Sequence, residues 1–158
     1  MKNIVIKVLN HLGYKYQIIV DKPQQTIIRL GMQLDNGRAD IYIDIRPEQE
    51  QVLISAVSPV IVPAHKRNAI AEFITRANFG LIIGSFEMDY NDGELKYKCN
   101  FLYDEDDCMS EKVFARNLLI SFHTLDKYLP GIMTVLYANV MPHSAIAQIE
   151  NAPDHNQN

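Results

Sequence analysis

The fold is decided by residues 28–45, IRLGMQLDNGRADIYIDI, where apolar and polar residues alternate on both sides of Asn36-Gly37. An Asn-Gly pair between two alternating segments predicts a hairpin with a two-residue type I′ turn. With this pair in the turn, the apolar residues face one another as Leu34 with Ala39, Met32 with Ile41, Leu30 with Ile43, and Ile28 with Ile45. The polar residues share the opposite face, which predicts an antiparallel sheet covered on one side only.

A second hairpin is predicted around Asp92-Gly93, where the same alternation recurs. With these two residues in the turn, the apolar pairs are Tyr90 with Leu95, Met88 with Tyr97, Phe86 with Cys99, and Gly84 with Phe101. The polar face then brings Asp89 against Lys96 and Glu87 against Lys98, two cross-strand pairs of opposite charge.

Further elements follow from the spacing of apolar residues. Residues 52–58 are predicted to form another strand. Polar and apolar residues also alternate over 14–20, and whether these residues form a further strand is left open. Apolar residues at helical spacing predict helices over 5–12, 70–77 and, after a Ser110 N-cap, 110–136. Pro130 predicts a kink or a restart in the last of these. A short segment holding Ile146 and Ile149 follows Pro142.

The resulting order is a helix, three or four strands, a helix, two strands and a helix. Tight turns rather than crossover helices join the strands, so the sequence predicts an α+β fold. We expect two layers, with helices packed on one face of an antiparallel sheet of five or six strands. Residues 1–150 are predicted to form a single domain, and residues 151–158 a polar tail.

Composition limits the classes of partner. The chain has 158 residues, 47% of them hydrophobic, and a net charge of −4, so we expect neither nucleic acid nor an anionic membrane as its partner. No apolar run is long enough to cross a membrane.

The two cysteines suggest no disulfide framework, which favours the reducing cytoplasm. Cys99 is expected in the core, Cys108 beside four acids is a poor nucleophile, and the acidic run 104–107 is expected to be a solvated loop.

The sequence carries none of the common catalytic signatures. The five histidines are scattered and lack metal-ligand spacing. Neither a phosphate-binding glycine loop nor a Gly-x-Ser-x-Gly nucleophile elbow is present. We therefore predict no catalytic, cofactor-binding or metal-binding residues, and expect a protein that is not an enzyme.

The segment Asn78-Phe79-Gly80-Leu81-Ile82-Ile83-Gly84-Ser85-Phe86-Glu87, followed by Asp92-Gly93-Glu94-Leu95-Lys96-Tyr97, resembles the YbjN family of bacterial sensory transduction regulators. That family has a fold similar to class I type III secretion chaperones, which are small, acidic, usually dimeric and non-catalytic. The resemblance implies a chaperone-like or regulatory module that forms a homodimer and binds an unknown protein partner. Gly80 and Gly84 are expected to serve backbone geometry or close packing, and Asn78 to cap a helix end.

Two functional hypotheses follow. The preferred one is a partner-binding surface on the uncovered face of the sheet, formed by Ile27, Arg29, Tyr42 and Asp44, or strand addition at an unpaired sheet edge. The alternative is a small-molecule binder or enzyme that uses a pocket between the long helix and the sheet.

Overall fold

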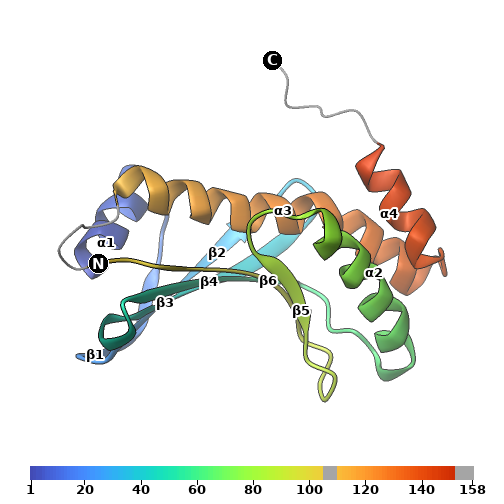
Figure 1. Ribbon diagram of the computed structural model, residues 1–158, viewed down its shortest axis with the longest axis horizontal. Coiled ribbons are helices and arrows are strands. Elements are labelled where there is room, and N and C mark those ends of the chain that lie inside the picture. The colour runs from blue at the N-terminus through green and yellow to red at the C-terminus, as the bar shows by residue number, and fades with distance from the viewer. Residues whose placement is uncertain (105–109, 152–158) are drawn as a thin grey trace.

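The structure is a computed structural model that describes residues 1–104 and 110–151, and its elements form two layers (Figure 1). The strands are β1 (Gln17–Lys22), β2 (Gln25–Gln33), β3 (Arg38–Arg46), β4 (Gln51–Val57), β5 (Ser85–Met88) and β6 (Leu95–Leu102). The helices are α1 (Lys2–His11), α2 (Arg67–Gly80), α3 (Glu111–Tyr137) and α4 (Pro142–Glu150), with short 3-10 helices at Pro47–Gln49 and Ala64–Lys66.

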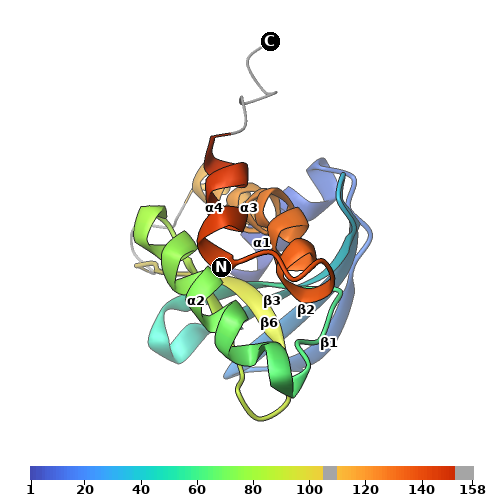
Figure 2. The ribbon, with the colours of Figure 1, turned by 90° about the vertical axis from the view of Figure 1, so that its right-hand side faces the viewer.

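All neighbouring strands pair antiparallel, in the order β1-β2-β3-β4-β6-β5. The long helix α3 crosses the sheet, and the other helices lie on the same side (Figures 1 and 2). The predicted α+β class and element order are confirmed, with residues 14–20 contributing only the start of β1.

The core lies between α3 and the sheet because the central strands alternate strictly. Their inward side chains are 2% exposed or less, and each valine, leucine or isoleucine among them contributes roughly 1.5–3 kcal/mol by leaving water. They are Ile28, Leu30, Ile41, Ile43, Ile45, Val52, Ile54 and Ala56. Leu53 and Val57, which left the face of β4 ambiguous in the sequence, lie on the opposite, open face.

The register predicted for the first hairpin is wrong by two residues. Leu30 lies opposite Ile41 rather than Ile43, and Met32 opposite Ala39. The loop residues are Asp35 and Asn36, and neither Asn36 nor Gly37 has the positive φ of a type I′ turn. A two-residue shift keeps every side chain on its predicted face of the sheet. The predicted two-layer arrangement therefore holds although the register is wrong.

A tertiary contact explains this choice of turn. The backbone N–H groups of Asp35 and Asn36 donate to the carboxylate of Asp126 on α3, at 3.3 and 2.8 Å. The turn preference of the local sequence takes no account of a hydrogen-bond partner about 90 residues away. Here that partner, Asp126, determines which residues form the loop.

The second hairpin is also shifted by two residues, so that Phe86 lies opposite Tyr97 and Met88 opposite Leu95. Its loop has four residues, 90–93, closed by the Asp89 N–H on the Glu94 carbonyl. Gly93 has φ +83°, and a Cβ there would lie 2.1 Å from the Val62 carbonyl oxygen, so only glycine fits.

Of the two charge pairs predicted on this hairpin, one is present in the structure and the other is not. The Glu87–Lys98 ion pair is confirmed, at 2.5 Å. Lys96 instead pairs with Glu94, at 3.2 Å, so its predicted pairing with Asp89 is wrong.

The long helix begins as predicted, because the Ser110 hydroxyl accepts the Val113 N–H at 3.3 Å. It then continues through Pro130 to Tyr137, so the predicted restart at the proline is wrong. Cys99 is buried as expected, and burial raises the pKa of its thiol. The predictions for Cys108, for most of the acidic run 104–107 and for the tail concern residues outside the described ranges.

Candidate functional site

Pro130 determines how α3 meets the sheet. Proline has no N–H, so the carbonyl of Asp126, four residues earlier, loses its usual helical donor. The side-chain amide of Asn36 donates to that carbonyl instead, at 3.2 Å, while the Asp126 carboxylate holds the two backbone N–H groups of the turn. The helix and the β2–β3 turn therefore satisfy each other's free hydrogen-bonding groups, and the helix continues through Pro130.

Two glycines allow close packing on either side of this point. A Cβ on Gly37 would lie 2.7 Å from Leu129 Cδ2, which places the turn directly against α3. A Cβ on Gly131 would lie 2.3 Å from Ile149 Cδ1 and 2.9 Å from the ring of Phe73. Gly131 thus lets α2 and α4 approach α3 closely.

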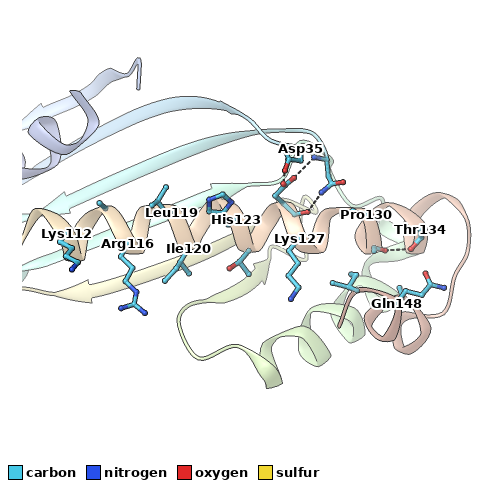
Figure 3. A pocket seen from close by; sticks show the side chains of 17 residues that line it. Asp35, Lys112, Arg116, Leu119, Ile120, His123, Lys127, Pro130, Thr134 and Gln148 are labelled. Atoms are coloured by element: carbon cyan, nitrogen blue, oxygen red, sulfur yellow. Dashed lines mark hydrogen bonds between the residues drawn. The ribbon is translucent and has the colours of Figure 1, made fainter. Parts of the chain in front are cut away.

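A groove of about 1080 Å³ runs along α3 between the β2–β3 turn and α4 (Figure 3). At about 100° per residue, its lining positions form a stripe on the side of α3 opposite the buried stripe. Several lining side chains are apolar, and most of these are half-buried rather than enclosed: Ala115, Leu119, Ile120, Pro130 and Ile149.

Positive charge borders this apolar strip. Lys112, Arg116 and Lys127 line the groove and project to one side of α3 (Figure 3). None of the three forms an ion pair or hydrogen bond with any residue in 1–104 or 110–151. By contrast, Lys7 on α1 is paired with Glu111 at the start of α3, at 2.5 Å. Three cations against the carboxylates of Asp35 and Asp126 leave the lining with a formal charge of +1. Since no described residue pairs with these cations, the groove favours a ligand that is both apolar and acidic.

The polar side chains of the groove include an imidazole and two carboxylates. His123 is a titratable side chain that lines it, and the Asp126 carboxylate is already engaged by the turn. Across the described residues, no three His, Cys, Asp or Glu side chains are grouped to hold a metal ion.

The pocket predicted between the long helix and the sheet is not where the groove lies. Along α3, the residues of the buried stripe are 4% exposed or less, so this interface is filled by side chains. They are Phe114, Leu118, Phe122, Leu125 and Leu129. The groove opens on the other side of the helix.

The four residues predicted for partner binding do lie together on the open face. Arg29 is opposite Tyr42, and Ile27 is opposite Asp44, on β2 and β3. Two of them are held by neighbours: Arg29 pairs with Asp40 at 2.8 Å, and Asp44 accepts from Gln25 and Arg46. Asp40 also raises the pKa of the Arg29 guanidinium.

The sheet edges differ in their openness to strand addition. At β5, the side-chain amide of Asn78 donates to the Phe86 carbonyl at 3.0 Å and accepts the Phe86 N–H at 2.7 Å. The predicted helix-cap role of Asn78 thus falls to its carbonyl, which accepts the Leu81 N–H, while its side chain covers the edge strand. At the other edge, β1 carries an irregularity between Ile18 and Val20.

The sequence interpretation missed the groove. The signal was present, because Lys112, Arg116 and Lys127 recur at spacings of four and eleven, which share one helix face. The contributions of α4 and of the β2–β3 turn could not be found this way, since both depend on contacts between distant segments.

Comparisons with known proteins bear on the family. Among the described residues, no helix is long and apolar enough to cross a membrane. No curated protein matches the sequence. A solved structure described as "Crystal structure of YbjN, a putative transcription regulator from E. coli" superposes with a TM-score of 0.56. It is 17% identical, over 88% of this chain and 91% of that one, which shows a shared fold.

The sequence profile of the YbjN family, described as "Putative bacterial sensory transduction regulator", matches residues 2–133. That range includes all six strands and most of α3. The chain therefore belongs to the YbjN family.

Proposed function

We propose that the chain is a non-catalytic, chaperone-like or regulatory protein that binds a segment of a protein partner along the outer side of α3. The observation that carries this proposal is the groove, in which three cations that pair with none of the described residues border a half-buried apolar strip. From Lys112 to Thr134 the groove follows about 33 Å of helix, a length suited to an extended or helical segment.

A protein partner fits the charge of the chain better than nucleic acid does. The E. coli protein of similar fold is described as "a putative transcription regulator", and the chain has a net charge of −4. A phosphate backbone would be repelled by most of this surface. An acidic segment carries far fewer charges than a phosphate backbone, so attraction by the groove cations, which no described residue pairs with, outweighs that repulsion. We therefore propose that regulation acts through protein contact.

The test uses a designed probe, a fluorescent helical peptide of about 20 residues, roughly 30 Å long, with leucines on one face and glutamates beside them. We expect the full chain to bind it, and Ile120→Asp or Lys127→Glu to weaken the dissociation constant by about tenfold or more. Fluorescence anisotropy measures the affinity.

Two controls accompany this experiment. Lys22→Glu makes the same charge change at an exposed position on β1, away from the groove, and should leave the affinity within about twofold. A scrambled peptide of equal composition should bind more weakly. Equal binding of both peptides, or equal weakening by Lys22→Glu and Lys127→Glu, would contradict the proposal.

The volume of the groove favours a second candidate function, the binding of a small apolar anion. Small-molecule sites occupy roughly 300–1,000 Å³, and the groove is of similar size. Titration with dodecanoate separates the two functions. Displacement of the peptide by dodecanoate at micromolar concentration, together with weak peptide binding, would favour the small-molecule function.

Three further features belong to the same proposal. We infer a homodimer, supported by Phe79 and Ile82, which are 97% and 98% exposed where α2 leads into β5. Neighbouring exposed apolar side chains that form a patch are typical of interaction surfaces. We also propose a cytoplasmic location, and a role for Ile27, Arg29, Tyr42 and Asp44 as a second partner-binding surface.

A further inference from the structure

A second pocket, of about 380 Å³, lies on the open face of the sheet, where β1, β2 and β3 meet. Its lining is formed mainly by polar side chains: Lys15, Tyr16, Gln17, Arg29, Arg38 and Asp40, with Gly31 and Leu30. The sheet separates this pocket from the groove on α3, because its residues alternate with those of the core.

The absence of a side chain at Gly31 shapes the pocket. A Cβ there would lie 3.2 Å from Arg38 Nη2 and 3.8 Å from Asp40 Oδ1. The Arg38 guanidinium therefore lies over the backbone of β2, in the space that a side chain would occupy. Arg29, two residues earlier on the same face, borders the pocket from the other side.

The charges in this pocket do not cancel. Asp40 pairs with Arg29, at 2.8 Å. The side chains of Arg38 and Lys15 form no ion pair or hydrogen bond with the part of the chain that the structure describes. Three cations and one carboxylate leave a local charge of +2, on a chain whose net charge is −4.

Guanidinium groups recognise phosphate and carboxylate oxygens through paired N–H donors. Arg29 on β2, Arg38 on β3 and Lys15 before β1 bring such positive groups into the lining of one concave site. Because the uncompensated charge is +2, an anion with two negative charges fits it better than one with a single charge.

We propose that this pocket binds the phosphate group of a small phosphorylated molecule. Arg38 and Lys15 supply the free charge, and Arg29 supplies guanidinium donors that Asp40 holds in place. Binding at this site is independent of the partner proposed for the groove.

The test is a titration of the full chain with inorganic phosphate at pH 8, in which two-dimensional amide NMR spectra are recorded at each phosphate concentration. Sodium chloride at matched ionic strength and sodium acetate are run in parallel. We expect saturable shifts confined to the amides near residues 15–17, 29–31 and 38–40 with phosphate, and much smaller shifts with acetate.

Substitutions then locate the site. Arg38→Gln and Lys15→Gln should each weaken phosphate binding by about tenfold. Arg46→Gln is the matched control, since Arg46 lies on the same face of β3, is held by Asp44 and does not line the pocket. It should change the affinity by less than about twofold.

The proposal is overturned if chloride at equal ionic strength reproduces the shifts, or if both Arg38→Gln and Lys15→Gln bind phosphate as the unaltered chain does. It is also overturned if Arg46→Gln weakens binding as much as they do. Lys15 is exposed and precedes β1, so Lys15→Gln gives a result even if Arg38→Gln fails to fold.

Discussion

Tyr128 buries its ring at the meeting point of α2, α3 and β5. The ring packs edge-to-face against Phe73 and Phe86, with centroids 6.4 and 5.4 Å away. Its hydroxyl lies 3.3 Å from Glu150 Oε1 on α4. Burial and the neighbouring Glu150 carboxylate both disfavour the phenolate, and together they raise the pKa of Tyr128 to about 12.

This raised pKa predicts a loss of stability at alkaline pH. A tyrosine in the unfolded chain has the ordinary pKa of 10.0, so between about pH 10 and 12 the unfolded chain releases a proton that folded Tyr128 keeps. The free energy of unfolding should therefore be unaffected by this group below about pH 10, and fall by about 1 kcal/mol per pH unit above it. Tyr128→Phe should make that slope shallower, as measured by urea unfolding between pH 9 and 11.

The remaining slope has known contributors, since burial also raises the pKa of Tyr14 and Tyr97. Tyr14→Phe removes one of these contributors, at a different place along α3 where the Tyr14 ring packs against Phe122, and should therefore also make the slope shallower. An identical alkaline slope in Tyr128→Phe and in the unaltered chain would show that Tyr128 does not titrate as described.

At the scale of elements, α3 and the β2–β3 turn depend on each other through one carbonyl. Asn36→Ala should cost about 1–2 kcal/mol in the unaltered chain, because it leaves the Asp126 carbonyl without a donor. In a Pro130→Ala background the new backbone N–H can reach that carbonyl, so the same substitution should cost less than about half as much. Chemical denaturation of the four variants of this cycle measures the coupling.

Asn36→Ala leaves the backbone bonds to the Asp126 carboxylate intact, since these come from N–H groups. The cycle therefore isolates the side-chain amide. Equal costs in the two backgrounds would mean that Asn36 and Pro130 are energetically independent.

The same pair of elements shows what the sequence can and cannot predict. The inward face of β2 and β3 was predictable, because alternation has a period of two and a register error of two leaves Leu30 and Ile41 inside. The exact register of β2 and β3 was not predictable, because it depends on hydrogen bonds from the turn to Asp126, which lies on α3. For the same reason the groove could be predicted only as cations on one face of α3, without its walls.

At the scale of the whole molecule, Phe79 and Ile82 are the basis of the proposed dimer. We expect sedimentation velocity to give a dimer at about 100 μM. Phe79→Ser combined with Ile82→Ser should convert it to a monomer with an unchanged circular dichroism spectrum, because the two substitutions remove apolar area that the dimer would bury. The pair should raise the dimer dissociation constant by about tenfold or more.

Leu102→Ser is the control for this experiment, since Leu102 is 74% exposed at the end of β6, in a different part of the surface. It should leave the dimer unchanged. A monomeric unaltered chain at that concentration, or a dimer that survives both serine substitutions, would rule out this surface.

The side chain of Asn78 has a further consequence for the molecule in a crowded solution. Free sheet borders are templates on which further chains can add and propagate into fibrils. By occupying both hydrogen-bonding groups of Phe86, one amide imitates an incoming strand and ends the ladder. Growth of an amyloid-like stack from the β5 border would first have to displace this amide, so a single polar side chain protects that border against self-templated aggregation.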